Sequence, residues 1–595
     1  MKFTDQQNVA MKKRLTVLLV LSVAVVSCGQ DESTDAEQPQ VLADQILLSG
    51  RIFTVNDAQR WAEAVAIRAG QIIYVGDNAG AAAFTGPGTV TNDLGGRLVI
   101  PGIVDAHTHP GGMGRYAAPG RLPTTSREDI LAAVKTYAEA NPDLDWIEMC
   151  CWPVRMYDMG RTGPNKKNLD RIVPDRPVWL TSDIGHSIWV NSKALELMGV
   201  NKNTPDPHPG VSFYVRDADG NATGWIKEKT YRKYRTQFFP VDQQANREGM
   251  DLFLNFLLSQ GVTSLMDGGN TYYSDEVYSY LSELDKAGNL PLRIEGTYHI
   301  FLPGQHDTAV AGLEKLRQKY EGDRLKLRTV KIHFDGTNEI RTGAVLEPYR
   351  DAPGNRGDTV LKTDELRDFI LQLHKNQFDL HLHTVGDRAV RIALDATEAA
   401  DLALAGKLHT RVTVSHLDII DTADYPRFRQ LGVIAQYTPS WHGVNFNDPV
   451  LAALGDERYA RTLVARPLFD DGAVVSFSSD VTSLRSYEFA NPYLGMQIAH
   501  NRQYPQDGIA AAYSPAEIRG PESEQLPLEY VIKAYTLGGA YQLRKEDDLG
   551  SIEAGKLADL VVLDQNLFEI DRNDIQHTKP VAVMMEGKIV SGRLN

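Results

Sequence analysis

The stretch that decides the fold is LVIPGIVDAHTH, residues 98–109. It begins with a short apolar run rich in β-branched side chains, which is typical of a buried strand. It ends in Asp-Ala-His-Thr-His, and alternate residues of an extended segment point to the same side. The stretch therefore predicts a buried strand from whose end His107 and His109 project together.

Further short apolar stretches follow along the chain, separated by helical patterns, and this alternation predicts βαβ units with parallel strands. We expect an α/β fold, a (β/α)8 TIM barrel over residues 105–544. A Pro- and Asp-rich run breaks the rhythm, so we expect an insertion at about 120–240 that caps the barrel mouth. The apolar stretches are residues 99–104, 262–266, 329–334, 378–383, 412–416, 433–436 and 473–478.

Both ends of the chain carry strand patterns with glycine turns. Residues 46–55 and 64–75 show them near the start, and residues 558–563 and 581–590 show them near the end. Because these patterns flank the barrel, we expect a small composite β-sandwich domain built from residues 44–104 and 545–595.

The first residues predict an export signal. A basic segment, Met11-Lys-Lys-Arg, precedes an apolar run over residues 15–26 that is shorter than the about 20 residues a membrane-spanning helix needs. The run ends in Val-Val-Ser-Cys28, which resembles a bacterial lipobox, with a plain secretory signal as the alternative. We expect a lipoprotein signal peptide over residues 1–28 and a polar, flexible tether over residues 29–43.

This resemblance implies an exported protein, lipid-anchored through Cys28 at the cell envelope. Gly29 after the cysteine favours the outer membrane, with the enzyme facing the periplasm and touching the membrane only through its lipid. The net charge of −15 disfavours nucleic acid and anionic membrane surfaces as partners. Three cysteines make no disulfide framework, and we expect Cys150 and Cys151 to be buried free thiols, with a vicinal disulfide or a metal ligand as alternatives.

Several residues with metal-binding side chains fall where the predicted strands end. These are His383, His416 and Asp480, while Lys331 lies inside a strand. In a parallel barrel the chemistry lies at the carboxyl ends of the strands. Imidazole and carboxylate groups suit Zn²⁺, so the order and placement of these residues predict a metal centre with an open position for water.

The run over residues 98–109 closely resembles the opening strand of amidohydrolases. More narrowly, the chain resembles the third amidohydrolase subfamily, the YtcJ-like group that includes N-substituted formamide deformylases. The resemblance extends from about residue 44 to the end of the chain. Its other matching runs are PDRPVWLTSDIGHSIWVNSKAL (174–195), VKIHFDG (330–336), LEPY (346–349), HTVGDRA (383–389), FSSD (477–480), NPYLG (491–495) and GSIEAGKLADLVVL (550–563).

The resemblance implies a role for each matching residue. His107 and His109 would be the first-strand metal ligands, and His383 and His416 those of the fifth and sixth strands. Asp480 would be both a ligand and the catalytic aspartate. Lys331 would be carboxylated and bridge two metals, or else lie beside a single metal. One or two divalent ions, Zn²⁺ first, are implied.

The implied reaction is hydrolysis of a non-peptide C–N bond in a small amide, N-acyl, formamide or carbamate. A metal would activate water, and Asp480 would act first as general base and then as general acid. His186 would polarise the scissile carbonyl and bind substrate, and Arg341 would bind a substrate carboxylate; a backbone-capping histidine and a surface arginine are the alternatives. A lactone or ester hydrolase, or a ligand-binding lipoprotein without catalysis, stays open, as does a homodimer.

Overall fold

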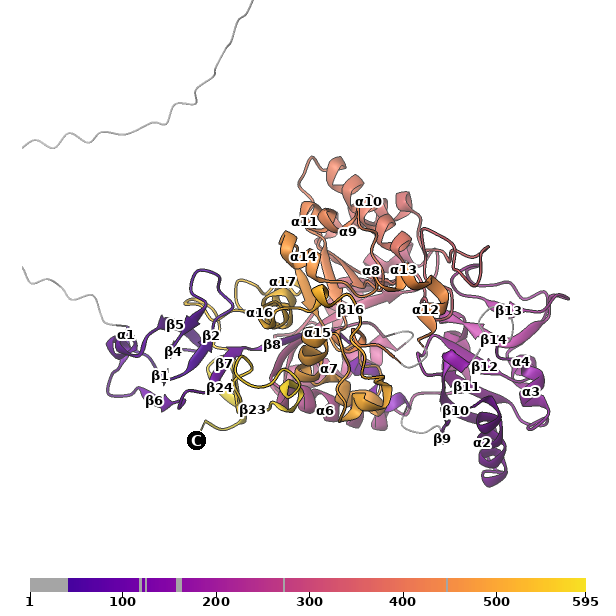
Figure 1. Cartoon of the computed structure of the whole chain (residues 1–595), viewed down its shortest axis with the longest axis horizontal. Helices are drawn as coiled ribbons and strands as arrows, with labels where there is room; N and C mark the ends of the chain where they lie inside the picture. The colour runs from indigo at the N-terminus through magenta and orange to yellow at the C-terminus, as the bar shows by residue number, and fades with distance from the viewer. Residues whose placement is uncertain are drawn as a thin grey trace, which may run out of the picture. The chain divides into compact units, whose positions relative to one another are not determined.

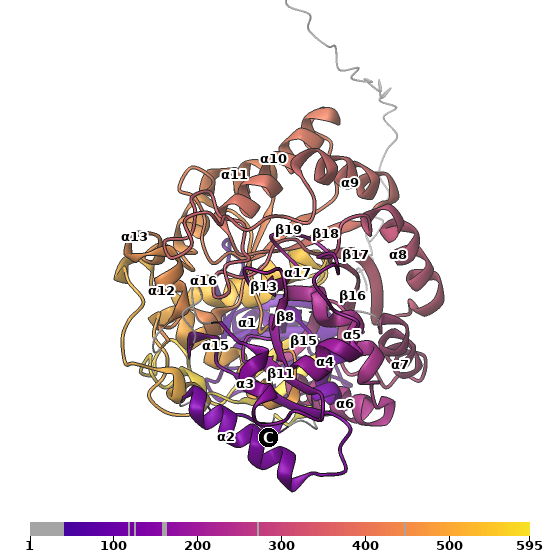
Figure 2. The same cartoon turned by 90° about the vertical axis from the view of Figure 1, so that its right-hand side faces the viewer.

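The centre of the fold is an eight-stranded, nearly closed parallel barrel, as Figures 1 and 2 show. Every neighbouring pair in its sheet is parallel. The predicted TIM-like barrel is therefore confirmed. In sequence order its strands are β8 (Ile103–Thr108), β15 (Val262–Asp267), β16 (Arg293–Ile300), β17 (Leu325–His333), β18 (Asp379–Thr384), β19 (Val412–His416), β20 (Ile434–Tyr437) and β21 (Val475–Phe477).

Helices that connect successive strands surround the barrel, and Figure 2 shows several of them on its outside. In one of them, α10, four of the eight buried residues are alanines, so much of its buried face consists of small side chains. The connecting helices are α7 (Ser274–Lys286), α8 (His306–Tyr320), α9 (Thr363–Asn376), α10 (Asp387–Ala403), α11 (Tyr425–Leu431), α12 (Pro449–Leu454), α13 (Asp456–Tyr459) and α14 (Arg466–Asp471). α6 (Gln243–Ser259) precedes β15, and α15 (Pro492–Asn501), α16 (Leu528–Lys533) and α17 (Gly539–Gln542) follow β21.

The first and last barrel strands meet through the segment that follows β21. The amide of Asp480 donates to the carbonyl of His107 at 2.9 Å, and the amide of His109 donates to Val481 at 3.0 Å. These bonds bring the end of the LVIPGIVDAHTH stretch against the aspartate that comes much later in the chain.

Two further sheets contain strands from the chain ends. β7 and β22 pair antiparallel, so one sheet joins N-terminal to C-terminal residues, as predicted. A Cβ on Gly102, between β7 and β8, would lie 2.5 Å from Thr263 Oγ1, so the direct passage from this sheet into the barrel requires glycine. The six-stranded sheet has β24 (Lys588–Gly592), β23 (Pro580–Met585), β22 (Leu560–Leu563), β7 (Leu98–Pro101), β2 (Arg51–Phe53) and β3 (Trp61–Ala62); the four-stranded sheet has β5 (Gln71–Gly76), β4 (Ala64–Arg68), β1 (Gln45–Leu48) and β6 (Val90–Asp93).

The insertion between β8 and β15 forms a mixed sheet of its own, which Figure 1 shows on the side of the barrel away from the terminal sheets. Its buried tryptophans, Trp152, Trp179 and Trp189, pack inside the insertion. The strands are β13 (Tyr214–Arg216), β14 (Ala222–Lys227), β12 (Ser187–Val190), β11 (Val178–Ser182), β10 (Ile147–Trp152) and β9 (Gly120–Arg121), and the helices are α2 (Arg127–Ala140), α3 (Lys166–Asp170), α4 (Ser192–Leu197) and α5 (Arg232–Phe238).

This computed structural model describes residues 41–116, 120–123, 126–156, 163–270, 273–445 and 448–594. The predicted signal peptide, Cys28 and most of the predicted tether lie outside the described residues. Within the described ranges, no helix combines the length and the apolar character needed to cross a membrane.

Candidate functional site

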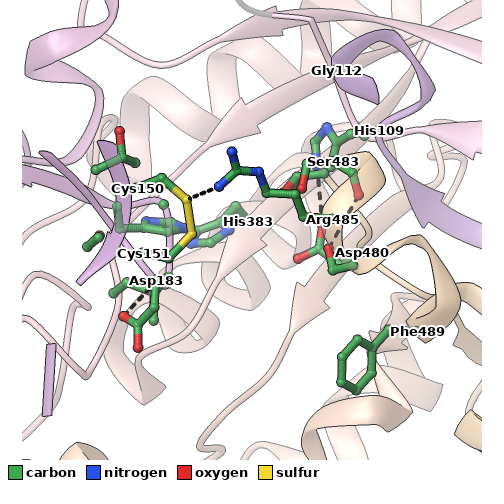
Figure 3. Close-up of a pocket in the computed structure, with 18 of the residues that line it drawn as sticks. His109, Gly112, Cys150, Cys151, Asp183, His383, Asp480, Ser483, Arg485 and Phe489 are labelled. Carbon is green, nitrogen blue, oxygen red and sulfur yellow. Dashed lines mark hydrogen bonds and ion pairs between the residues drawn. A yellow bond between two sulfur atoms is a disulfide. The ribbon is translucent and has the colours of Figure 1, made fainter. Parts of the chain in front are cut away.

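A pocket of about 500 Å³ opens at the carboxyl ends of the barrel strands. The barrel supplies its floor, with His107, Lys331 and Asp480 among the lining residues. The insertion supplies part of the wall, including Cys150 and His186. Figure 3 shows these two sources facing each other across the pocket. The sequence placed the predicted ligands at strand ends, and the fold brings them to this one floor.

Two of the predicted histidine ligands converge on the carboxylate of a third predicted ligand, Asp480. Oδ1 of Asp480 lies 3.2 Å from Nε2 of His109 and 3.5 Å from Nε2 of His107. The other ring nitrogens are engaged elsewhere, since Nδ1 of His109 donates to the Gly269 carbonyl at 3.1 Å and Nδ1 of His107 lies 2.9 Å from Nε2 of His381. Such contacts fix ring orientation, so both histidines present Nε2 to the same point.

Lys331 and His416 complete this group. Nζ of Lys331 lies 3.5 Å from Nε2 of His107, and Nδ1 of His416 lies 3.9 Å from Oδ2 of Asp480. Burial lowers the pKa of the Lys331 amine to about 7 and that of His416 to about 3. His416 is therefore neutral near neutral pH, which is the form that ligates metals, and a large fraction of the Lys331 amine is uncharged there.

His383 lies next to His416 on the pocket floor. The centroids of their rings are 4.5 Å apart. His383 also stacks on His333, with the two ring centroids 4.1 Å apart. His381, one alternate position earlier on β18, is fully buried below the pocket and contacts His107.

The backbone at the site adopts unusual conformations. Asp480 has φ +49° and His416 has φ +77°, values that side chains other than glycine rarely adopt. Such residues cost about 1–3 kcal/mol each and persist where the surroundings fix them. The Asp105 carboxylate provides part of that support, because it accepts hydrogen bonds from the amide of Ser479 at 3.0 Å and from its hydroxyl at 2.6 Å.

Comparison with known proteins agrees with this geometry. The amidohydrolase family model matches residues 90–591, which is most of the chain. The chain belongs to the amidohydrolase family. It is 30% identical to YtcJ of Bacillus subtilis (strain 168) over 512 residues, covering 85% of this chain and 91% of that protein. It is also 23% identical to the N-substituted formamide deformylase of Arthrobacter pascens over 571 residues, covering 92% of this chain and 98% of that enzyme.

The fold of this amidohydrolase also matches solved structures. An uncharacterized metal-dependent hydrolase from Pyrococcus horikoshii OT3 superimposes with a TM-score of 0.64 at 22% identity, covering 89% of this chain and 99% of that one. The predicted family and its YtcJ-like subgroup are confirmed. The chain is therefore an amidohydrolase-family hydrolase whose barrel carries candidate His/Asp metal sites.

A second cluster, which the sequence analysis did not single out, adjoins the first. The carboxylate of Glu228 is fully buried and accepts hydrogen bonds from Nδ1 of His186 at 2.7 Å and from the Thr342 hydroxyl, and it lies 3.2 Å from Nε2 of His333. Burial opposes its ionisation, but the neighbouring His186 charge and hydrogen bond hold the pKa of Glu228 below its usual value. Glu228 comes from the insertion, directly after β14, and only the fold brings it to the barrel histidines.

The structure differs from two of the sequence-based expectations, those for Arg341 and for the two adjacent cysteines. Arg341 is 4% exposed, pairs with Asp351 and does not line the pocket, so the structure does not bring it to the substrate site. The expectation of free thiols at Cys150 and Cys151 is wrong, because a disulfide joins the two sulfurs. A vicinal disulfide is one of the two alternatives named above, and both of its cysteines line the pocket (Figure 3).

Proposed function

We propose that this amidohydrolase cleaves non-peptide C–N bonds in small molecules: amides, N-acyl compounds, formamides or carbamates. The observation that carries the proposal is the convergence of two imidazoles and one carboxylate on a pocket floor, with Nε2 of His109 and of His107 at 3.2 and 3.5 Å from the same oxygen of Asp480. One relative is named an N-substituted formamide deformylase, and the bond that this name describes belongs to the same class.

The residues of the floor fit a divalent metal. His107, His109 and Asp480 can offer one ligand atom each within a common space. Among the described residues, Nδ1 of buried His416 has no hydrogen-bond partner, which leaves its lone pair available. This nitrogen and carboxylate set is the one that Zn²⁺ prefers, and a bound zinc ion supplies Lewis acidity and a lowered pKa for water. We propose zinc as the resident ion.

Lys331 is the proposed additional ligand. Its amine lies 2% exposed on the barrel floor, 3.5 Å from Nε2 of His107. The lowered pKa, about 7, leaves a large fraction of the amine uncharged near neutral pH. Because only an uncharged amine reacts with CO₂, we propose that Lys331 is carboxylated and that two ions bind, the second beside His383 and His416.

Asp480 is the proposed proton carrier. Burial opposes the ionisation of Asp480, but the hydrogen bond from His109 and the electrostatic attraction of the surrounding side chains hold the pKa of Asp480 below its usual value. Asp480 is therefore ionised at neutral pH and able to accept a proton from water. It can then deliver that proton to the nitrogen that leaves, which is general base and general acid catalysis by one residue.

His186 is the proposed donor to the scissile carbonyl. It lines the pocket, while Glu228 holds its Nδ1 at 2.7 Å. That contact directs Nε2 away from Glu228. With Nδ1 donating to Glu228, Nε2 can donate to an oxygen on which negative charge develops only when the ring carries both protons, and the adjacent carboxylate stabilises that charged ring. Because His186 belongs to the insertion, this proposal makes the insertion part of the reaction site.

We propose in addition that the protein is exported and lipid-anchored through Cys28 in the cell envelope. The support is the basic and apolar signal pattern before Val-Val-Ser-Cys28. Growth with a labelled fatty acid tests it: the parent is expected to incorporate label and the Cys28→Ser variant is not. Label in the variant, or none in the parent, would contradict the anchor.

The hydrolase proposal is tested on the full-length chain. Zinc content is measured by elemental mass spectrometry, and hydrolysis is followed on formamides, acetamides, carbamates and esters of one common aryl-methyl group. Amine release is expected from the C–N substrates. Asp480→Asn is expected to lower kcat by about 10²–10⁴-fold, while Asp471→Asn, on α14 outside the pocket lining, is the matched control. Turnover confined to esters, or full activity in Asp480→Asn, contradicts the proposal.

A further inference from the structure

The carboxyl end of β10 carries the Cys150–Cys151 disulfide on the wall of the pocket. The two cysteines are unequally accessible, since Cys150 is 7% exposed and Cys151 is half-buried. A thiolate attacks a disulfide at the sulfur that it can reach. A small reductant that enters the pocket is therefore expected to attack at Cys151.

A guanidinium contacts the other sulfur. Nη1 of Arg485 donates to Sγ of Cys150 at 3.0 Å, and Figure 3 shows this contact between the Arg485 side chain and the disulfide. When a disulfide is attacked, the second sulfur leaves as a thiolate, and a neighbouring arginine stabilises its negative charge. Cys151 is thus placed for attack and Cys150 is placed to leave.

Reduction of this disulfide consumes one dithiol. A thiolate of the dithiol attacks Sγ of Cys151, the S–S bond breaks, and its electron pair goes to Sγ of Cys150, which takes up a proton. The second thiolate of the dithiol then attacks the mixed disulfide at the dithiol's own sulfur and releases Cys151 as a thiol. The chain gains two electrons and two protons, and the dithiol becomes a cyclic disulfide.

Cys151 is also the extra residue of a β-bulge. The register of β10 against β11 shifts between Cys150 and Trp152, with Cys151 as the residue in between. The φ of Cys151 is +81°, in the left-handed region that residues other than glycine rarely adopt and keep only where the surroundings impose it. The covalent link to Cys150 is one such constraint, and reduction removes it.

The bulge is tied to the turn that carries His186. Directly after the disulfide, the carbonyl of Trp152 accepts the amide of Asp183 at 3.0 Å. The amide of Val154 donates to the Asp183 carboxylate at 3.2 Å, which makes a second contact between the same two segments. Asp183 and His186 lie in the turn between β11 and β12. A change in the backbone at the disulfide is therefore transmitted to the turn of the pocket histidine.

We propose that the Cys150–Cys151 disulfide is a redox-reactive site that Arg485 activates. A dithiol reduces it in the folded protein, and reduction loosens the turn that carries His186. The closed disulfide is the form that holds this part of the wall in place. The effect on turnover rests on the proposed hydrolase function, whereas the reduction and the loosening do not.

Reduction is measured on the folded, full-length chain. The protein is incubated without denaturant with dithiothreitol, a small dithiol, and free thiols are then alkylated with iodoacetamide and located by peptide mass spectrometry. Cys150 and Cys151 are expected to be alkylated together, and only after addition of the dithiol. Alkylation that requires denaturant, or alkylation of both cysteines before the dithiol is added, would overturn the proposal.

Variants of Arg485 test its role as the activating group. Arg485→Met is expected to slow the reduction about tenfold, because the leaving sulfur loses a charge-assisted contact. Arg485→Lys keeps a cation and is expected to retain most of the rate. Arg429→Met is the control, because the Arg429 side chain is 65% exposed on α11 and does not line the pocket. Reduction of Arg485→Met at the parent rate or faster would overturn the activation.

Amide hydrogen exchange tests the loosening without any substrate. Residues 182–186 are expected to exchange about tenfold or more faster in the reduced chain than in the oxidised chain, because local opening becomes easier. Helix α9, which supplies no residue to the pocket lining, is the internal control and is expected to exchange alike in both forms. Unchanged exchange over residues 182–186 would overturn the link between the disulfide and His186.

Turnover separates this proposal from the hydrolase proposal. On reduction, kcat is expected to fall about tenfold or more and to return on reoxidation, with zinc content unchanged, because a displaced His186 is less well aligned. The double variant Cys150→Ser, Cys151→Ser controls for chelation of zinc by the dithiol and is expected not to respond to it. An equal loss in parent and double variant would overturn the effect on turnover. A parent inactive in both redox states would contradict the hydrolase proposal while the thiol and exchange results still support the redox site.

Discussion

Oε2 of Glu228 lies 2.7 Å from Nδ1 of His186, a contact that joins a fully buried carboxylate to an imidazole on the pocket wall. The carboxylate sits between this imidazole and that of His333. A buried carboxylate in this position fixes which nitrogen of His186 carries the proton and stabilises the ring when it becomes charged.

Replacing Glu228 by glutamine tests this role. Glu228→Gln keeps the shape and a hydrogen-bond acceptor but removes the charge, so kcat is expected to fall about 10–100-fold, a typical effect for a residue that orients a reacting group. Zinc content and KM are expected to change little. Glu546→Gln, at an ion pair with Arg411 away from the pocket, is the control. A loss of zinc instead would assign Glu228, His186 and His333 to a metal site.

Metal stoichiometry reports on Lys331. About two zinc equivalents are expected in the parent and about one or none in Lys331→Ala, because the carboxylated side chain would hold both ions. Lys326→Ala, on the same strand but with its amine bonded to the Gly322 carbonyl, serves as the control. One equivalent in both parent and Lys331→Ala, by elemental mass spectrometry, would leave a mononuclear site and remove Lys331 from the ligands.

Gly268 lies against the rings of His107 and His109 and leaves no room there for a larger side chain. A Cβ there would lie 2.5 Å from Nε2 of His107 and 2.8 Å from Cε1 of His109, so Gly268→Ala forces both rings to move. We expect zinc affinity to fall about 10–100-fold, as it does when residues that orient ligands are altered. Gly354→Ala, where no atom lies within 4 Å of the added Cβ, is expected to bind zinc normally. Unchanged affinity in competition with a chelator would show that the rings are not held rigidly.

Glu295 gives a pH-dependent stability that is separate from the site. It is buried at the start region of β16, and burial raises the pKa of its carboxyl from 4.5 to about 7. Between these two values the folded chain holds a proton on Glu295 that the unfolded chain releases. The stability that the protonated carboxyl contributes is therefore fully present below pH 4.5 and is lost as the pH rises through about 7. Between those values the free energy of unfolding is expected to fall by up to about 1.4 kcal/mol per pH unit from this group.

Denaturant unfolding of Glu295→Gln measures that contribution. The variant cannot titrate at this position, so its stability relative to the parent is expected to be higher at pH 8 than at pH 5. Its amide oxygen can still accept the backbone amide of Arg328, which Glu295 binds at 2.8 Å. A constant difference between variant and parent over this range would show that Glu295 titrates alike in both states.

Much of the fold followed from local patterns. The apolar strands, the helical spacing between them and the strand pairs at both chain ends are encoded in neighbouring residues, which is why the barrel and the sheet that joins the termini were predicted. The ligand histidines were found because their positions at strand ends are a local property. β16 was not among the predicted strands, and with it His299, which lines the pocket, was missed.

Other features depended on contacts between distant segments. Glu228 shows no motif that marks it, because its position matters through a histidine that only the folded chain brings within reach. Arg341 could not be excluded from the pocket by sequence, since the direction of its side chain is set by Asp351 and by a left-handed backbone at φ +60°.

The sequence by itself determined the family, the parallel barrel and the identity of the floor residues, because hydrophobic periodicity and strand-end positions are properties of short segments. The tertiary structure decided which residues form the wall above that floor. The insertion folds as its own sheet and places Cys150, His186 and Glu228 opposite the barrel strands, and such contacts arise from packing between elements rather than from the pattern within any one of them.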